Sequence, residues 1–159
     1  EVLKKNRPYI KRFTSSGFID DLARGDTCVT IGFGGDLNIA KRRAEEAGGK
    51  EKIRVMMPKE GVGIWVDSFV IPKDAKHVAN AHAYINDFLD PEVAAKNGNF
   101  VTYAPSSKPA QDLMDEEFRN DNTIFPTDED LKNSFIMVPI QPAALKFMVR
   151  QWQSVKAGK

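Results

Sequence analysis

The stretch 58-PKEGVGIWVDSF-69 carries the strongest signals for fold and function in this sequence. A turn over Pro58–Gly61 leads into a β-rich run whose side chains alternate between two faces. One face is apolar, and the other places a carboxylate between two aromatic rings. The first comprises Val62, Ile64 and Val66, and the second comprises Trp65, Asp67 and Phe69. Because a buried carboxylate costs free energy, Asp67 needs a cation, a hydrogen-bond donor or water.

Around this stretch, length and composition are those of one globular domain. The 159 residues are 42% hydrophobic and 28% charged, which argues against disorder. The 23 basic and 22 acidic residues give a net charge of +1 and form no long run of one sign, so a nucleic-acid partner is not indicated. Cys28 is the single cysteine, which leaves the redox compartment undetermined.

The two ends of the chain carry little targeting information. No apolar run approaches the ~20 residues of a membrane span. The start at Glu1 resembles the middle of a helix rather than a signal sequence. We therefore expect either a processed N-terminus or a piece of a longer protein.

Strand and helix patterns alternate along the chain and predict an α/β fold with a mixed sheet and flanking helices. The predicted extended segments are 9–13, 27–33, 52–57, 62–69, 100–104 and 135–140. The predicted helices cover 1–6, 18–24, 36–47, 74–89, 91–98, 112–118, a segment after Thr127, and 142–155. The segment 27–33 is rich in β-branched residues and is predicted to be buried.

The segment 31-IGFGGD-36 lies at the predicted end of a strand and start of a helix, where ligands bind in open α/β sheets. A dinucleotide fingerprint would need a glycine at the position of Leu37, and the Gly-Lys-Ser/Thr run of an ATP loop is absent. Asp36 would also repel a phosphate at the helix start. Spacing alone favours the simpler interpretation that Asp36 is the N-cap.

Other candidate side chains also have structural interpretations. Asp67 at a strand end in water, with Trp65 in the core, is at least as consistent with the residues alone as a binding role. Tyr103 precedes a Pro/Ser loop and fits a core or rim aromatic. His77 and His82 lie five apart on different faces of a predicted helix, so a metal site is not indicated.

Catalysis has little support in the sequence. The serines lack a Gly-x-Ser-x-Gly context, and neither histidine stands beside a candidate nucleophile. Asp36 and Asp67 can in principle act as an acid/base pair, so a hydrolase stays open as an alternative.

Four motifs in order resemble one known family. They are 15-SSGFIDDLARGD-26, 32-GFGGD-36, 58-PKEG-61 followed by 65-WVD-67, and 155-VKAGK-159. Together they resemble the C-terminal part of the periplasmic spermidine/putrescine-binding proteins, the receptors of polyamine ABC importers. The resemblance covers essentially all 159 residues, and the Pro-Lys-Glu-Gly turn followed by aromatic-x-Asp is its most specific element.

The resemblance implies a type II periplasmic-binding-protein fold, with two α/β lobes that close on a linear polyamine. Residues 1–64 and 109–159 would belong to the second lobe, and residues 65–108 to the hinge and the first lobe. The N-terminal segment that forms most of the first lobe would be missing. We then expect the portion from Trp65 to Phe100 either to rearrange or to bury its uncovered apolar surface against another copy of the chain.

The resemblance also implies a ligand site with no catalytic residue, no cofactor and no metal. The implied ligand contacts are Phe33, Asp36, Trp65, Asp67, Tyr103 and Gln141. At the position of Phe33 the family usually has a tryptophan. Implied partners are a polyamine and the membrane permease of an ABC transporter, in the periplasm. A solute-binding protein for an amino acid, an iron complex or a sugar is the other alternative, and the two aspartates disfavour an anion.

Overall fold

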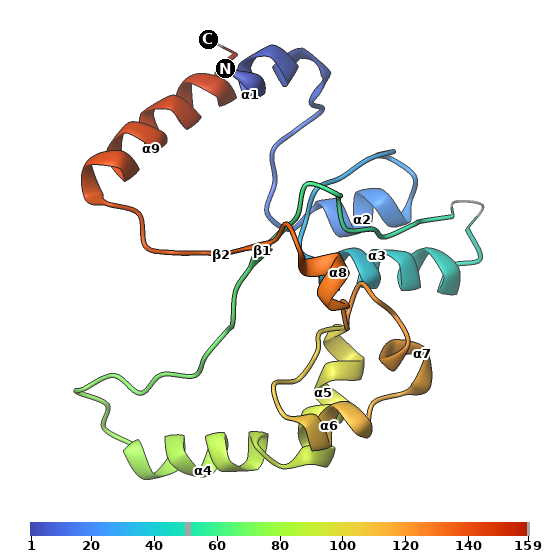
Figure 1. Ribbon diagram of the computed structural model, residues 1–159, viewed down its shortest axis with the longest axis vertical. Coiled ribbons are helices and arrows are strands. Elements are labelled where there is room, and N and C mark those ends of the chain that lie inside the picture. Colours follow the sequence, from blue (N-terminus) through green and yellow to red (C-terminus); the bar gives the residue numbers. More distant parts are fainter. Residues whose placement is uncertain (50–51, 159) are drawn as a thin grey trace. The chain divides into compact units, whose positions relative to one another are not determined.

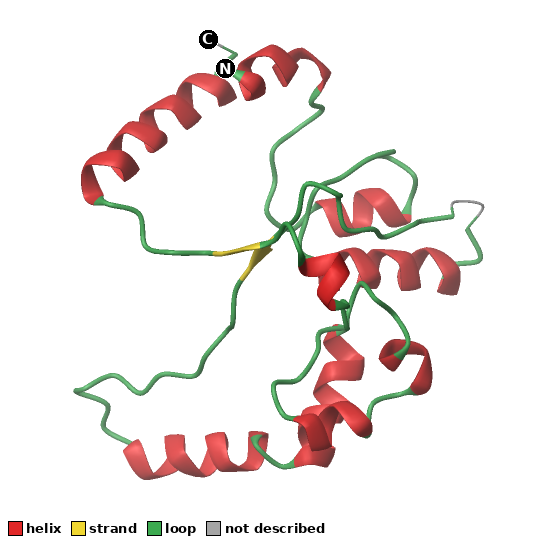
Figure 2. Ribbon diagram, viewed as in Figure 1, coloured by secondary structure: helices red, strands yellow, loops and turns green. Residues whose placement is uncertain are grey.

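The computed structural model describes residues 1–49 and 52–158 as helices joined by long loops, with two very short strands among the described residues (Figures 1 and 2). In chain order the elements are α1 (Val2–Asn6), η1 (Arg7–Tyr9), α2 (Phe18–Ala23), α3 (Gly34–Glu46), β1 (Gly63–Ile64), α4 (Val78–Phe88), α5 (Pro91–Val101), α6 (Lys108–Asp112), α7 (Glu116–Arg119), α8 (Asp128–Leu131), β2 (Phe135–Ile136) and α9 (Pro142–Lys156).

The chain divides into two compact units. One consists of Glu1–Gly17 together with the chain from Met137 onward, and it contains α1, η1 and α9. The other, Phe18–Ile136, contains all remaining elements. All the predicted ligand residues except Gln141 belong to the larger unit.

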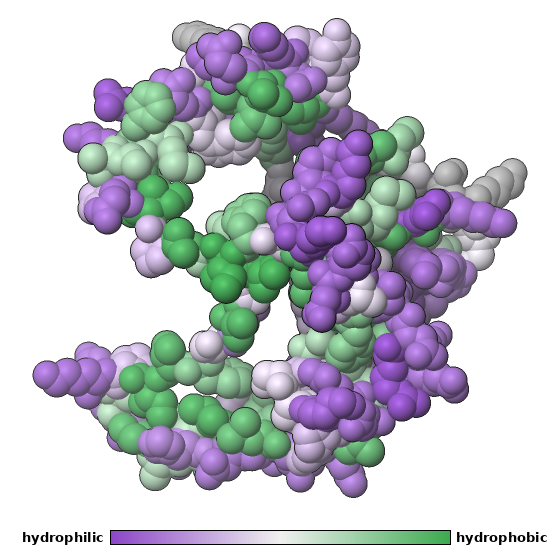
Figure 3. Space-filling view, viewed as in Figure 1, coloured by the Kyte–Doolittle hydropathy of each residue, from purple (hydrophilic) through white to green (hydrophobic). Residues whose placement is uncertain are grey.

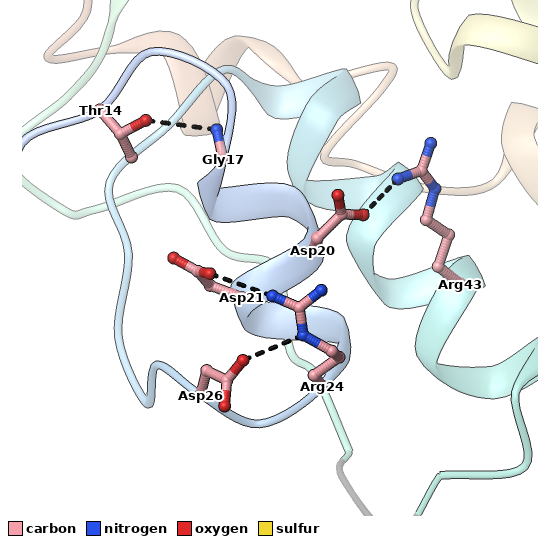
Figure 4. Close-up of polar contacts among 7 residues, drawn as sticks. All are labelled: Thr14, Gly17, Asp20, Asp21, Arg24, Asp26 and Arg43. Carbon is pink, nitrogen blue, oxygen red and sulfur yellow. Dashed lines mark hydrogen bonds and ion pairs between the residues drawn. The ribbon is translucent and has the colours of Figure 1, made fainter.

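A small apolar core holds α2 against α3 in the larger unit. Its members are Phe18, Leu22 and Ala40, with Ile19, Leu37 and Ile53 packed around them. One ion pair joins the two helices, with Arg43 Nη1 2.6 Å from Asp20 Oδ1, and a second, Arg24 with Asp26 at 3.0 Å, lies within the segment that follows α2 (Figure 4). These pairs are exposed, so apolar burial contributes most to the association of the two helices.

A second cluster joins α5 to α6 and to α3. Small residues of α5, among them Ala95 and Gly98, are buried, and a Cβ at Gly98 would lie 3.1 Å from Met114 Sδ. Arg42 of α3 donates hydrogen bonds to the carbonyl oxygens of Asn99 (3.3 Å) and Phe100 (3.1 Å). Since these carbonyls lie in the last turn of α5, the arginine ties the end of α5 to α3.

The predicted turn at Pro58–Gly61 is confirmed. The amide of Gly61 donates to the Pro58 carbonyl over 3.0 Å, and Gly61 has a φ of +94°. A Cβ there would lie 2.1 Å from the Asn133 carbonyl oxygen, so only glycine fits. The turn leads into β1, which pairs in parallel with β2 through Gly63 with Phe135 and Ile64 with Ile136.

Most helix predictions are confirmed within a few residues, and three strand predictions are wrong. Segments 27–33 and 52–57 are loops, and Val29 and Ile31 are 83% and 99% exposed rather than buried. Segment 100–104 forms the end of α5 and a turn. Extended chain becomes a strand only beside another strand that accepts its hydrogen bonds, and among the described residues only β1 and β2 provide that pairing.

Both units expose large apolar side chains. No residue of α4 is buried, and Val155 is the one buried residue of α9. Trp152 of α9 still contacts Phe13 edge to face at 4.6 Å within its own unit. Apolar residues are visible at the surface over α4 and over β1 and β2 (Figure 3). None of the described helices has the length and apolar character needed to cross a membrane.

Candidate ligand-binding site

The first turn of α3 carries one of the two predicted carboxylates. Phe33 is the N-cap, with φ −72° and ψ 140°, and α3 begins at Gly34. Asp36 therefore lies inside the first turn, and the prediction that it caps the helix is wrong. The two glycines before it adopt helical geometry, which moves the helix start two residues earlier. A carboxylate in this turn is stabilised by the helix dipole and remains half-buried at the surface.

The ring of Tyr103 packs on the backbone of the same turn. A Cβ at Gly35 would lie 2.1 Å from Tyr103 Cε2, so the ring occupies the space that a side chain would take. The residue before the tyrosine, Thr102, is buried and donates from Oγ1 to the Gly35 carbonyl over 2.8 Å. These contacts bring the end of α5 to the start of α3.

Two half-exposed rings meet beside this turn. Phe33 and Trp65 are 49% and 44% exposed, and their centroids are 5.2 Å apart at an interplanar angle of 69°. Trp65 follows directly after β1, whereas Phe33 precedes α3. Edge-to-face packing stabilises such a pair and leaves ring surface open to a ligand.

The charges of both predicted carboxylates act on the pKa of the Tyr103 phenol. Burial raises its pKa above the ordinary value, and the negative charge of Asp36 raises it further. Hydrogen bonding to the backbone of Asp36 and Gly35 opposes this rise, and the charge of Asp67 adds to it. Five of the six predicted ligand residues thus belong to one neighbourhood: Phe33, Asp36, Trp65, Asp67 and Tyr103.

The predicted face of alternating side chains is only partly formed. The strand ends at Ile64, so Asp67 lies in an exposed loop rather than between two rings on a sheet. Phe69 instead packs against Tyr84 and Phe88 of α4, with centroid distances of 5.7 and 5.1 Å. The ring that packs against Trp65 is Phe33, from a different segment.

Gln141 belongs to the other compact unit. It is the N-cap residue of α9, is exposed, and makes no side-chain capping hydrogen bond. Its role as a ligand contact stays a prediction.

The sequence patterns missed two residues of this neighbourhood. Thr102 ends α5 in the left-handed conformation, with a φ of 57°, at a position that glycine usually takes. For Gly35, the sequence patterns predict only a place at the boundary between a strand and a helix. A threonine in place of the usual glycine gives no local signal, because the tertiary contact with α3 is what holds it there.

Two shallow hollows lie elsewhere in the described part of the larger unit. One, of about 250 Å³, is lined by residues that include Lys59, Asp130 and Asn133, and the other, of about 290 Å³, by residues that include Gln111, Arg119 and Phe125. Neither includes a predicted ligand residue. The described residues contain no group of three or more His, Cys, Asp or Glu arranged to hold a metal ion.

Comparison with known proteins places these residues in context. Residues 1–127 match the family model described as bacterial extracellular solute-binding protein. Over 159 residues the chain is 38% identical to the putrescine-binding periplasmic protein SpuD of Pseudomonas aeruginosa and 37% identical to the putrescine-binding periplasmic protein PotF of Escherichia coli. The alignment covers 100% of this chain and 43% of each relative.

A solved structure supports the same relation. The spermidine/putrescine ABC transporter substrate-binding protein PotD of Streptococcus pneumoniae, in complex with calcium and HEPES, superimposes with a TM-score of 0.72 at 27% identity. The match covers 98% of this chain and 46% of that protein. The predicted fold class is thereby confirmed: helices and a small parallel sheet form part of an α/β periplasmic-binding-protein fold. The chain spans less than half the length of the proteins it matches.

Proposed function

Because the chain belongs to the family of bacterial extracellular solute-binding proteins, we propose that it is part of a polyamine receptor of an ABC importer. The proposed ligand is a putrescine-like or spermidine-like amine, as in the names of its relatives. The proposed location is the periplasm, and the proposed partner is the permease of the importer.

The observation that carries this proposal is the grouping of the Phe33–Trp65 ring pair and the Tyr103 ring at the start of α3, whose first turn carries Asp36, with Asp67 two residues after Trp65. An ammonium group over an aromatic face is stabilised by about 0.5–2 kcal/mol, and a charged hydrogen bond to a carboxylate by about 1.5–3 kcal/mol. A diamine that meets Asp36, Asp67 and the rings of Phe33 and Trp65 would satisfy both kinds of group. Micromolar binding, about −8 kcal/mol, is within reach of such a set after association costs.

We assign roles on this basis. Asp36 and Asp67 bind the ammonium groups, and Phe33 and Trp65 flank the methylene chain. Tyr103 provides a further aromatic contact, while Gln141 is retained as a polar contact from the family resemblance alone. A phenylalanine at position 33 has no indole N–H, so the chain of the amine, rather than a polar group on it, is what this ring would recognise.

Calorimetric titration tests the assignment. The full-length product of the gene is titrated with putrescine, spermidine and agmatine, as the unchanged protein and as Asp67→Asn. We expect heat with at least one amine and an affinity at least about tenfold lower in the variant, since 1.4 kcal/mol corresponds to tenfold. The matched control is Asp87→Asn on the exposed side of α4, which should bind normally. Absence of heat with all three amines would refute the proposal.

We propose further that no bond is made or broken at this site. Recognition of an amine by carboxylates and rings needs no nucleophile, and the relatives are named as binding proteins. The alternative hydrolase would use Asp36 and Asp67 as acid and base. Turnover of a glycoside that is lost in both Asp→Asn variants would favour the hydrolase.

The division into lobes also stays a proposal, with residues 1–64 and 109–159 in one lobe and 65–108 in the hinge and the other lobe. In support, Trp65 lies at one proposed crossing, and Tyr103 lies a few residues before the other. Hydrogen exchange should then show the strongest ligand protection around residues 62–67 and 102–105. Protection confined to residues outside these two segments would contradict it.

Self-association of the 159-residue chain is proposed from its exposed apolar surface. Phe69 and Tyr84 are 55% and 57% exposed although they pack on each other, and an apolar patch of this kind favours contact with another copy. Light scattering over a range of concentrations should show a mass that rises above 17.8 kDa. A constant monomer mass would rule this out.

A further inference from the structure

We propose that Gly35 and Thr102 form a positioning pair that holds the Tyr103 ring against the first turn of α3, and that ligand affinity depends on this placement. The inference rests on the proposed function. Neither residue is expected to touch the ligand. Each acts through Tyr103, whose phenol lies near the two carboxylates.

Gly35 provides the space. It is buried in the first turn of α3, and a Cβ there would lie 2.1 Å from Cε2, 2.4 Å from Cδ2 and 2.6 Å from Cζ of Tyr103. The ring therefore lies flat on the backbone of the turn. Since the carbonyl of Gly35 lies within α3 and also accepts from Thr102, a methyl group at position 35 is expected to displace the ring rather than the helix.

Thr102 sets the direction in which the chain leaves α5 and enters Tyr103. Its φ of 57° is in the left-handed region, where a β-branched residue is an outlier that only surrounding structure can maintain. Thr102 is 2% exposed, and its Oγ1 lies 2.8 Å from the Gly35 carbonyl oxygen and 2.7 Å from that of Val101, so its one proton is shared between the two acceptors. Of these two, the bond to Gly35 is the one that reaches across to α3. Because Tyr103 is the next residue, this bond fixes the position of the Tyr103 backbone from which the ring extends.

The two contacts converge on one peptide unit. The carbonyl that accepts from Thr102 belongs to Gly35, the residue on which the Tyr103 ring lies. Arg42 holds the preceding turn of α5 to the same helix. The arrangement thus fixes Tyr103 relative to Asp36 through its ring and through the chain that precedes it.

A pair of adjacent glycines gives the first test. Gly35→Ala and Gly34→Ala both add one methyl group in the first turn of α3, but a Cβ at Gly34 meets only the Thr123 carbonyl oxygen at 3.7 Å, an ordinary contact. In the full-length protein, Gly35→Ala should lower putrescine or spermidine affinity at least about tenfold, and Gly34→Ala less than about twofold. Thermal unfolding of both variants checks that the fold is retained.

The ionisation of Tyr103 gives a readout that does not need a ligand. The ultraviolet phenolate signal of Tyr103 is isolated by subtracting the titration of Tyr103→Phe. In the unchanged protein this phenol should titrate above its ordinary value of 10.0, because burial and the carboxylates raise its pKa. In Gly35→Ala the displaced ring is solvated, so the pKa should return toward 10.0.

A second pair of variants tests the hydroxyl. Thr102→Val removes the bond to Gly35 and keeps the shape, whereas Thr102→Ser keeps the bond. We expect weaker amine binding and a lower phenol pKa with valine, and normal values for both with serine. If Gly35→Ala fails to fold, this pair alone decides.

The outcomes separate the two proposals. If no amine binds the unchanged protein, the proposed function fails, and the dependence of affinity fails with it; the phenol titration still shows whether the pair places the ring. If an amine binds but affinity stays the same in Gly35→Ala and Thr102→Val, the positioning role is overturned. An unchanged phenol titration in folded Gly35→Ala also overturns it.

Discussion

Helices α3 and α4 are similar in length and lie in different environments. Each has apolar residues at helical spacing, yet α3 buries Gly35, Asn38, Ala40 and Ala44, whereas α4 buries no residue. The neighbours of the two helices differ: α2 and the end of α5 cover α3, whereas Tyr84 and Phe88 of α4 pack against Phe69 and against each other. A helical pattern thus specifies an apolar face, and the neighbouring segments decide whether that face is buried.

The largest expected loss of stability comes from a charge placed on the buried face of α3, compared with the same charge on α4. Ala40→Asp puts a carboxylate at a position that is 0% exposed between α2 and α3, and an uncompensated buried charge costs about 3–5 kcal/mol. Ala83→Asp puts the same group on α4 at an exposed position, where the expected change is within about 0.5 kcal/mol. Urea unfolding of the 159-residue chain measures both. Equal losses would mean that α4 is as well covered as α3.

A smaller effect is expected where the β-turn meets the chain before β2. Gly61→Ala combines a positive φ with a backbone clash at the Asn133 carbonyl oxygen, so its cost should exceed the about 1–3 kcal/mol of the backbone conformation alone. Gly48→Ala, at a φ of 61° with open space around it, isolates the conformational cost and should lose about 1 kcal/mol.

Comparison of the two unfolding midpoints gives the contribution of the contact between the turn and residue 133. If both substitutions cost the same, the close approach does not constrain the chain.

Local signals predicted much of the fold, and long-range pairing accounts for the errors. The predicted helix starts at residue 91 and after Thr127 are confirmed, because each is completed within a few residues: Asp90 caps α5, and Thr127 forms a capping box with Asp130. The segment at Thr27 has β-branched residues but lacks a neighbouring strand among the described residues, and local composition does not reveal that.

The ligand neighbourhood follows the same division. The resemblance named Phe33, Asp36, Trp65, Asp67 and Tyr103, and the structure brings these five into one region of the larger unit. The residue patterns alone predict that Asp36 caps the helix and that Phe69 lies on the same face as Asp67, and the structure shows neither. The supporting contact between Thr102 and Gly35 joins residues 67 apart in sequence, so neither pattern nor motif could predict it.

Helix capping gives the next effect in size. Asp90 accepts hydrogen bonds from the amides of Glu92 (2.9 Å) and Val93 (3.2 Å), so Asp90→Ala should destabilise α5 by about 1 kcal/mol. Asp115 is also an N-cap residue, before α7, but its side chain makes no capping hydrogen bond, and Asp115→Ala should change little. Thermal unfolding distinguishes the two. Equal losses would show that charge near a helix start, and not the hydrogen bonds, is responsible.

The smallest expected effect is a pH dependence at α8. Hydrogen bonds from the Thr127 side chain, then from its backbone amide, lower the pKa of Asp130 below the ordinary 3.8. A lowered pKa in the folded state means that the contribution to stability is fully present above pH 3.8 and is lost as the pH falls through the lower folded value.

Carboxyl titration by NMR should show the lowered pKa of Asp130, and Thr127→Val should move it back toward 3.8 because the hydroxyl donor is gone. Thr127→Ser, which keeps a hydroxyl, should leave the lowered value in place. A pKa unchanged by valine would assign the shift to the backbone amide alone.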